Sequence, residues 1–386
     1  MTGPVIDMLD WRGRAERLAA QLVELGALED PRWQAAVRET PRHEFVPRWL
    51  AQDVHGRWRP VAHDDPATVA EWTERTYTDI PLVTAVDGGT PISSSTQPGL
   101  MTRMLDVLDV ADDHTVLEIG TGTGYNAALL CNRLPDEQVH SLDREPALTA
   151  VARERLCRLG YRPRLTTRDG VTGWPEHAPY DRMMATCSVP RIPSAWGGQT
   201  RAGGLVLADL KIGAGVGNLA LLRAGPDGLT GRFLATSAGF MALRSTTVPV
   251  LRRARPAAPA GQVERRLRHA TLPLPLGPVE SFFTALALPG NHLAHGMVLD
   301  PDSEQPATDR YTAEDGSWCE IDRAAPTVAR TSGPTPVLDI LLAARKRHLA
   351  LGRPAWNRFG LTVAPDGTHT VWLDEPATMS WTLPTG

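Results

Sequence analysis

The order of hydrophobic and polar positions divides the chain into segments of two kinds. Between residues 115 and 210, short apolar runs alternate with stretches in which apolar positions recur every three or four residues. Strands that alternate with helices of this length predict a mainly parallel, doubly wound α/β sheet of the Rossmann-like class. The expected strands are residues 115–119, 138–142, 164–167, 180–185 and 204–210.

Upstream of this region, the pattern predicts helices separated by irregular chain. Residues 41–50 and 58–77 are rich in Pro, Trp and charge and have no clear period. The tract TPISSSTQPG at residues 90–99 has no hydrophobic period at all, so we expect a loop there. Apolar positions at helical spacing predict helices over residues 12–25, 31–40 and 100–110.

Downstream of about residue 244 the composition changes. Residues 246–280 are rich in Pro and Arg and are interpreted as a linker. Residues 281–386 contain short apolar runs, an amphipathic helical pattern over residues 338–351 and, near the end, an Asp-Gly turn between two strand-like runs. We therefore expect three parts: a catalytic domain over residues 1–245, the linker, and a smaller α+β domain over residues 281–386.

Composition and charge exclude several classes of protein. The 386 residues are 42% hydrophobic and 22% charged, which is typical of a soluble globular protein. Forty basic against 44 acidic residues give a net charge of −4, so no basic excess indicates a nucleic-acid partner. The sequence has no signal-peptide pattern, no membrane-spanning run, no paired cysteines and no metal-ligand spacing. We expect a cytoplasmic protein without a metal or a membrane contact.

The chemistry is concentrated where the predicted strands end. A glycine-rich turn, GTGTG at residues 120–124, follows the first strand of the alternating region. Such a turn lets the backbone approach a ligand closely and exposes the first amides of the next helix. Acidic residues stand at three strand ends, and Asp143 follows Gly120 by 23 residues, the spacing of an acid that binds a ribose diol. The three acids are Glu118, Asp143 and Asp169.

The spacing within the turn favours one cofactor class over another. The glycines are arranged as GxGxG with Glu118 two residues before the first, and not as the GxGxxG of pyrophosphate-binding loops. An acid inside the loop would repel a pyrophosphate, whereas S-adenosylmethionine (SAM) carries an ammonium and a sulfonium group. SAM is therefore favoured over NAD. The alternative is a tight turn without a ligand.

The residues around this turn carry a resemblance to a known family. The segment VLEIGTGTGYNAALL at residues 116–130 is similar to the SAM loop of the protein L-isoaspartyl O-methyltransferase family, and QPGLMTRMLDVL at residues 97–108 resembles its Gln-Pro segment and the helix after it. Further similar segments lie in the same order between about residues 11 and 245. The resemblance implies a SAM-dependent carboxyl O-methyltransferase with a Rossmann-like fold over these residues, and the smaller α+β domain expected at residues 281–386 lies outside it.

The resemblance also implies roles for individual residues. Glu118 and the glycines of the turn would line the methionine end of SAM, Asp143 would hold the ribose, and the Asp169-Gly170 pair would meet the adenine. The implied cofactor-binding set is Gln97, Glu118, Gly120, Thr121, Gly122, Gly124, Tyr125, Asp143, Arg144, Asp169 and Gly170.

The acceptor side depends on a row of hydroxyl groups. In the family a Ser stands directly before Gln-Pro and faces the acceptor carboxylate. An ungapped alignment from Gln97 puts Thr96 in that position, whereas an alignment from the Ile92-Ser93 pair inserts about two residues. The candidates for contact with the acceptor are Ser93, Ser94, Ser95 and Thr96. A carboxylate is already ionised at neutral pH, so positioning rather than a general base is the task of these residues.

The C-terminal extension influences the expected acceptor. It is similar to that of extended methyltransferases associated with ribosomal peptide maturation, and we do not expect it in the repair enzymes. The favoured hypothesis is methylation of an Asp side chain in a modified, macrocyclic precursor peptide, with closure of the ester to an aspartimide. The alternative is repair of isoaspartyl residues in damaged proteins. A non-catalytic SAM-fold partner and a small-molecule methyltransferase are the further hypotheses.

Overall fold

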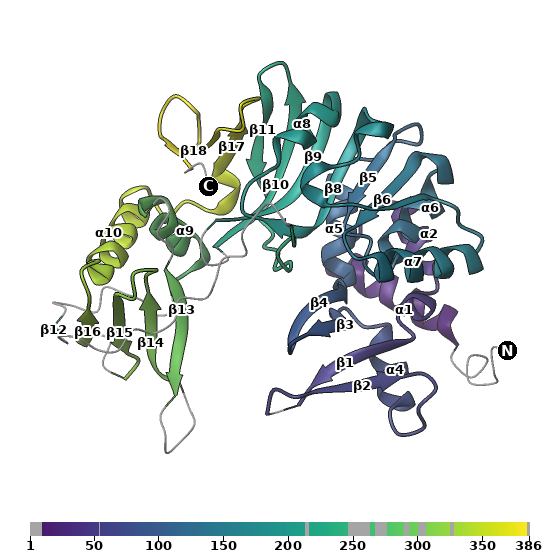
Figure 1. The fold of residues 1–386 in the computed structure, drawn as a ribbon, viewed down its shortest axis with the longest axis horizontal. Helices are drawn as coiled ribbons and strands as arrows, with labels where there is room; N and C mark the ends of the chain where they lie inside the picture. Colours follow the sequence, from purple (N-terminus) through teal and green to yellow (C-terminus); the bar gives the residue numbers. More distant parts are fainter. Residues whose placement is uncertain are drawn as a thin grey trace.

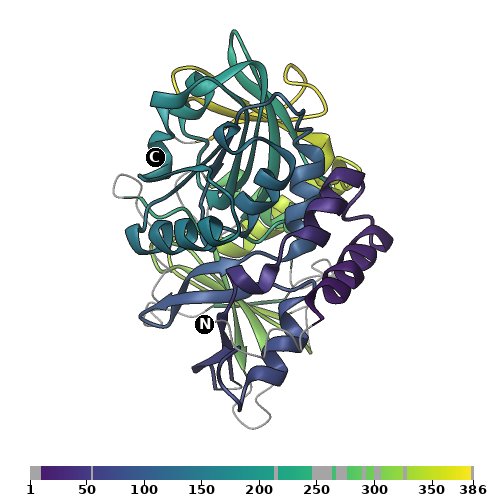
Figure 2. The same cartoon turned by 90° about the vertical axis from the view of Figure 1, so that its right-hand side faces the viewer.

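The computed structural model describes residues 10–53, 55–212, 216–245, 263–266, 276–288, 293–299, 306–324 and 328–383. Within these residues the chain forms one ten-stranded sheet and two smaller sheets of four and five strands. Both small sheets lie below the large one in Figure 1 and in the view turned by 90° in Figure 2. No helix in the described ranges is long and apolar enough to cross a membrane.

The N-terminal region combines helices with the four-stranded sheet, whose order is β2-β1-β3-β4. Its first two helices, α1 and α2, carry buried apolar faces and pack against each other. The elements are α1 (Trp11–Glu24), α2 (Pro31–Glu39), α3 (Arg42–Phe45), β1 (Arg48–Gln52), β2 (Trp58–Ala62), α4 (Val69–Thr76), β3 (Leu82–Asp87), β4 (Thr90–Ser95) and α5 (Pro98–Val107).

Strand β4 corrects the expectation of a loop at residues 90–99. It pairs antiparallel with β3, with Leu82 opposite Ser95 and Val83 opposite Ser94. Backbone hydrogen bonds to β3 hold this Ser-rich strand, and a hydrophobic period does not report such bonds. Residues 41–50 and 58–77, which look irregular in sequence, also contain short strands and helices.

The large sheet has the order β19-β18-β17-β11-β10-β9-β8-β5-β6-β7. Strands β5 to β9 pair in parallel as predicted, but β10, β11 and β17–β19 pair antiparallel, so the sheet is only half parallel. The elements are β5 (Val116–Ile119), α6 (Tyr125–Arg133), β6 (Val139–Asp143), α7 (Pro146–Arg158), β7 (Arg164–Thr167), β8 (Tyr180–Val189), α8 (Ser194–Gln199), β9 (Thr200–Ile212), β10 (Val216–Gly225) and β11 (Gly228–Phe233). Short 3-10 helices lie at Asp136–Gln138, Gly170–Thr172, Pro175–His177 and Trp356–Arg358.

Each face of the large sheet is covered by its own hydrophobic core. Alternate residues of one strand point to opposite faces, as Val116 and Leu117 of β5 show, because they belong to different core clusters. Helices α1, α2, α5 and α6 bury their apolar faces on one side. Helix α8 and the aromatic residues of the C-terminal region cover the other side. Strand order reverses at β5, so the carboxyl end of β5 is the expected ligand position of this sheet.

The C-terminal region does not form a single separate unit as expected for residues 281–386. Strands β17–β19 extend the large sheet through the pairing of β17 with β11, and Phe359 packs edge-to-face on Phe282 of α9 with ring centroids 5.6 Å apart. The five-stranded sheet has the order β12-β16-β15-β14-β13. The elements are β12 (Val263–Arg266), α9 (Pro278–Ala287), β13 (Ala294–Leu299), β14 (Pro306–Thr312), β15 (Trp318–Asp322), β16 (Val328–Ser332), α10 (Val337–Ala350), β17 (Phe359–Val363), β18 (His369–Leu373) and β19 (Ser380–Thr382).

The expected linker at residues 246–280 lies mostly outside the described residues. Its described parts are β12, which pairs with β16, residues 276–277 and the start of α9. Residues 263–266 of the expected linker therefore belong to the five-stranded sheet. A strand of four residues rich in Glu and Arg gives no apolar alternation from which it could be recognised.

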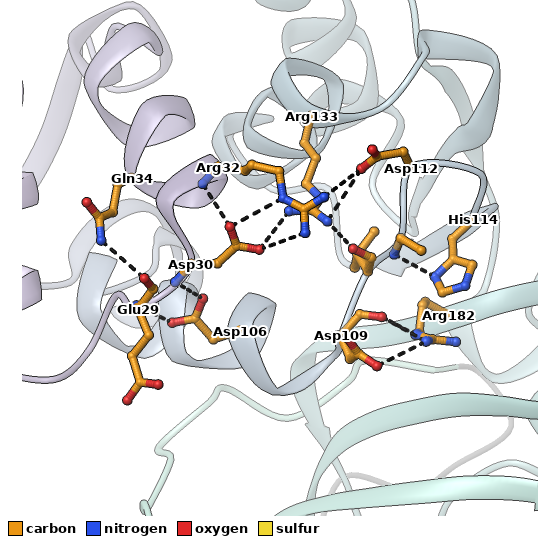
Figure 3. Close-up of polar contacts among 12 residues, drawn as sticks. Glu29, Asp30, Arg32, Gln34, Asp106, Asp109, Asp112, His114, Arg133 and Arg182 are labelled. Atoms are coloured by element: carbon orange, nitrogen blue, oxygen red, sulfur yellow. Dashed lines mark hydrogen bonds and ion pairs between the residues drawn. The ribbon is translucent and has the colours of Figure 1, made fainter.

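A buried arginine fastens the N-terminal helices to the large sheet (Figure 3). Arg133, at the end of α6, pairs with Asp30 over 2.9 Å, and Asp30 in turn accepts from the backbone amide of Arg32 at the start of α2. The Arg133 guanidinium also donates to the Val110 carbonyl and lies over the Trp33 ring, 4.8 Å from its centroid. The start of α2, the end of α6 and the turn before β5 are thereby held together.

Candidate active site

A cavity opens at the carboxyl ends of β5, β6 and β8, where the strand order reverses. Four segments form most of its wall: the end of β4 with the residues after it, the glycine-rich turn with the start of α6, the turn after β6, and residues 239–244. The glycine-rich turn and the turn after β6 carry most of the predicted cofactor residues, and the end of β4 carries the predicted acceptor hydroxyls. The fold therefore brings both predicted halves of the site to one cavity.

The glycine-rich turn is held close to the neighbouring strand. Gly120 has a φ of +105°, and Thr186 of β8 donates its hydroxyl to the Gly120 carbonyl over 2.7 Å. A Cβ on Gly120 would lie 2.5 Å from the Thr186 hydroxyl oxygen, so no larger residue fits there. Gly124 serves packing instead, because a Cβ there would lie 3.2 Å from the Cβ of Ala152 in α7.

Glu118 is buried at the base of the cavity. Its Oε1 accepts from the Asn126 side-chain amide over 2.7 Å, and its Oε2 accepts from the Ser141 hydroxyl over 2.5 Å. Burial raises the pKa of Glu118 to about 7, although these two hydrogen bonds act in the opposite direction. Ionising this buried carboxyl is costly, and a cation bound beside it would reduce that cost.

Two acidic residues hold the turns at the other end of the cavity. Asp143 accepts from the backbone amides of Gly122 and Glu145. Asp169 accepts from the Val171 amide over 3.0 Å and from the Ser245 hydroxyl over 2.7 Å. Residue 245 follows the segment 239–244, which therefore approaches the cavity wall at this end.

The acceptor hydroxyls lie on a strand whose side chains alternate. Ser93 and Ser95 are buried, and Ser93 accepts a hydrogen bond from the Thr84 hydroxyl over 2.9 Å. Beyond the strand, Gln97 donates its side-chain amide to Asp79 over 3.0 Å, and Asp79 also accepts from the Gly99 amide over 2.6 Å. The row of hydroxyls is thus anchored at the end that leads into α5.

Most of the predicted site residues line the cavity. Those in its wall are Ser93, Ser94, Ser95, Thr96, Gln97, Glu118, Gly120, Thr121, Gly122, Tyr125, Asp143, Arg144 and Gly170. Gly124 and Asp169 are not in the wall: the former packs on α7, and the latter supports the turn from behind.

Sequence reasoning missed a further part of the wall. The missed residues include Asn126, Thr186, Cys187 and the segment 239–244. Asn126 lies one residue after Tyr125 in the helix that follows the glycine-rich turn. Its position in the first turn of that helix could have identified it as a site residue from the sequence. The segment 239–244 has no such signal, because it reaches the cavity from beyond β11.

These residues fit the expected cofactor. A buried carboxyl whose ionisation is costly, Glu118, suits the ammonium of SAM, and Asp143 at the end of β6 suits its ribose hydroxyls. No group of three or more His, Cys, Asp or Glu side chains in the described part of the chain is arranged to hold a metal ion.

Comparisons with known proteins show the family of this chain. The family model "Protein-L-isoaspartate(D-aspartate) O-methyltransferase" matches residues 65–223. The protein-L-isoaspartate O-methyltransferase of Synechococcus sp. (strain JA-2-3B'a(2-13)) is 34% identical over 198 residues, which cover 51% of this chain and 69% of that protein. The protein of the same name from Methanopyrus kandleri is 33% identical over 197 residues, covering 50% and 75%.

The chain belongs to the protein-L-isoaspartate O-methyltransferase family. It is a SAM-dependent protein carboxyl O-methyltransferase with the α/β fold of that family. SAM is its cofactor, and its acceptor is a carboxyl group of a protein or peptide.

A solved structure bears on the C-terminal extension. A structure titled "protein-L-isoaspartate O-methyltransferase" aligns over 96% of this chain and 100% of its own, with a TM-score of 0.54 and 22% identity. The fold of this methyltransferase, extension included, therefore occurs in a protein that carries the isoaspartate name. Our expectation that such an extension is absent from that kind of enzyme is corrected, and the extension alone does not distinguish the two acceptor classes.

Proposed function

We propose that this methyltransferase transfers a methyl group to an Asp side chain of a ribosomally synthesised, modified peptide. The ester then closes to an aspartimide when the following backbone nitrogen attacks it and expels methanol. The observation that carries the proposal is the row of four consecutive hydroxyl residues at the acceptor side of the cavity, at residues 93–96. We further propose that the protein acts in the cytoplasm, where its four free cysteines stay reduced.

A row of hydroxyls suits a large, constrained acceptor. Where a single hydroxyl orients one carboxylate, additional hydroxyls and backbone amides on the same strand can bind neighbouring carbonyl groups of a macrocycle. The buried pair, Ser93 and Ser95, faces the interior, and Ser94 lies between them on the opposite side of the strand. The strand therefore offers hydroxyls on both of its faces.

The chemistry needs positioning and no base. The cofactor supplies an electrophilic methyl group. A carboxylate oxygen of the acceptor forms the new bond to that carbon as the bond from carbon to sulfur breaks, and both charges disappear. The residues of this chain hold the carboxylate in line with that bond, and orientation of this kind contributes several kcal/mol to catalysis, on the order of 7–11 at most.

The second candidate is methylation of isoaspartyl residues in damaged proteins. It is favoured by the fold similarity along the whole chain to a structure titled protein-L-isoaspartate O-methyltransferase. In that case the acceptor is a flexible peptide, and the extension has no need to recognise one particular substrate.

A methylation assay separates the two candidates. The purified enzyme is incubated with SAM and either a short isoaspartyl peptide or a cyclised precursor peptide encoded beside this protein, and products are followed by mass spectrometry. A methyl ester on the precursor that decays to a species one water lighter than the starting peptide supports the proposal. Methylation of the isoaspartyl peptide alone overturns it in favour of the second candidate.

A further inference from the structure

Arg42 of α3 is a fully buried arginine beside the acceptor side of the cavity. Its side chain is 0% exposed. One terminal nitrogen donates to the carbonyls of Thr76 and Thr78, each over 3.0 Å. The other donates to Ser95 Oγ over 3.4 Å and to the carbonyls of Ile80 and Thr96 over 3.2 and 3.3 Å. All five acceptors are uncharged oxygens.

The charge of Arg42 is therefore only weakly compensated. No carboxylate within the described ranges forms an ion pair with it. Asp79 acts on it at longer range, but the Asp79 oxygens are occupied by the Gln97 side chain and the Gly99 amide. Burial lowers the pKa of Arg42, yet a guanidinium keeps its proton in proteins. A buried cation without a counter-ion is costly unless a bound anion compensates it.

The position of Arg42 shows where such an anion would bind. Ser95 and Thr96, which Arg42 contacts, line the cavity, whereas Arg42 itself does not. The guanidinium carbon also lies 5.9 Å from the ring centroid of Tyr125, the first residue of α6 after the glycine-rich turn. Residues 92–97 of the wall carry no charge, and the arginines of the wall, Arg144 and Arg244, lie at the cofactor end.

We propose that Arg42 is a positioning residue that makes the acceptor side of the cavity selective for an ionised carboxylate, acting through the Ser95 hydroxyl, which accepts from Arg42 and can donate its own proton to the carboxylate. This inference rests on carboxyl methyl transfer and applies to either acceptor class of the proposed function. The carboxylate loses its charge during the reaction. A fixed cation therefore stabilises the bound substrate at least as strongly as the transition state, so its removal raises KM without lowering kcat.

The first test compares two ligands of the wild-type enzyme saturated with S-adenosylhomocysteine, which cannot transfer a methyl group. One is the peptide that the enzyme methylates, whichever class it belongs to, and the other is the same peptide with the acceptor carboxyl replaced by an amide. We expect the carboxylate to bind at least about tenfold more tightly. Equal affinity would overturn the inference while leaving the proposed function intact, because methylation itself identifies the acceptor.

The second test uses variants. Arg42→Met should reduce the preference for the carboxylate to less than about threefold and raise KM about tenfold, with kcat changed by less than about threefold. Arg42→Lys, which keeps the charge, should retain more of the preference than Arg42→Met. The inference fails if Arg42→Met keeps the full preference, or if it lowers kcat at an unchanged KM.

A matched control and an independent variant complete the design. Arg182→Met removes another buried arginine that donates to backbone carbonyls, those of Leu108 and Asp109, and should leave the preference unchanged. Asp79→Asn removes the nearby negative charge and should strengthen the preference about two- to threefold. A weaker preference in Asp79→Asn would contradict the inference even if Arg42→Met does not fold.

Discussion

Gly122 and Asp143 are joined by a direct hydrogen bond, in which the Gly122 amide donates to Asp143 Oδ2 over 2.9 Å. The other oxygen of Asp143 accepts from the Glu145 amide over 3.0 Å. The carboxylate at the end of β6 thus holds the glycine-rich turn after β5 and the start of α7 at the same time. Two features that the sequence shows separately, the turn and the acid after it, form one structural unit.

We expect Asp143→Asn to raise the dissociation constant of S-adenosylhomocysteine more than about tenfold. An Asn cannot accept from both backbone amides, since one of its two side-chain atoms is a donor, and it also loses the charge that strengthens bonds to ribose hydroxyls. Isothermal titration calorimetry measures the effect. Asp181→Asn is the control, because Asp181 accepts from the Thr115 amide at the opposite end of the strands. Unchanged affinity in Asp143→Asn would contradict the assigned role.

The raised pKa of Glu118 makes the stability of the ligand-free protein depend on pH. Burial raises that pKa from 4.5 to about 7, so between these values the folded state holds a proton that the unfolded chain has lost. The free energy of unfolding should therefore fall as the pH rises from about 4.5 to about 7 and level off above that range. Thermal unfolding across this range should show a weaker fall in Glu118→Gln than in the wild type.

The same carboxyl should couple cofactor binding to a proton. The ammonium of the cofactor favours the ionised form of Glu118, so binding near pH 7 should release protons. Calorimetric titrations with S-adenosylhomocysteine in two buffers of different ionisation enthalpy measure this release. The release attributable to this group should be absent in Glu118→Gln, and an identical release in that variant would show that another group is responsible.

Arg133→Met should lower the free energy of unfolding by about 2–4 kcal/mol, because it removes the buried guanidinium that joins Asp30 to the Val110 carbonyl, while Asp30 keeps only its bonds to Arg32 within α2 (Figure 3). Asp112 provides the matched control. Its side chain is 74% exposed and lies 3.6 Å from Arg133, so Asp112→Asn should cost less than about 1 kcal/mol. Urea unfolding of both variants measures the difference. Equal losses would mean that the Asp30 contact does not hold α2 in place.

Phe359→Ala should destabilise the catalytic sheet itself. Phe359 is fully buried, and its strand pairs with β11, so we expect a loss of about 3–5 kcal/mol in the unfolding transition that S-adenosylhomocysteine stabilises. Met297→Ala, at a 55% exposed position of β13, should change this transition by less than about 0.5 kcal/mol. Phe359→Ala could instead destabilise only a second unfolding transition, one that S-adenosylhomocysteine does not shift. That result would show that β17–β19 unfold independently of the rest of the large sheet.

The parallel half of the large sheet and most of the cofactor wall could be predicted because their signals are local. Strands β5, β6 and β8 and the middle of β9 carry apolar runs close to their own turns, and Asp143 stands directly at a strand end. Strand β4 gave no such signal, because Ser93 and Ser95 are polar and are held by pairing with β3.

Features that depend on distant parts of the chain could not be predicted. Arg42 and Ser95 are 53 positions apart, and nothing in the PRHEF pattern at residues 41–45 shows that this arginine is buried. The run at Phe359–Val363 indicates a strand. Its partner β11 lies more than 100 residues earlier, so local sequence patterns could not predict its place in the large sheet.

The joining of β17 to β11 has a consequence for how this enzyme is made. Residues 228–233 leave the ribosome long before residues 359–363, yet the edge of β11 is paired only when the last strands arrive. Until then the unpaired edge of β11 can form backbone hydrogen bonds with other chains, and such pairing leads to aggregation. We therefore expect the methyltransferase to complete its sheet only after residues 359–373 have been synthesised, with the pairing of the β17–β18 hairpin on β11 as a late step of folding.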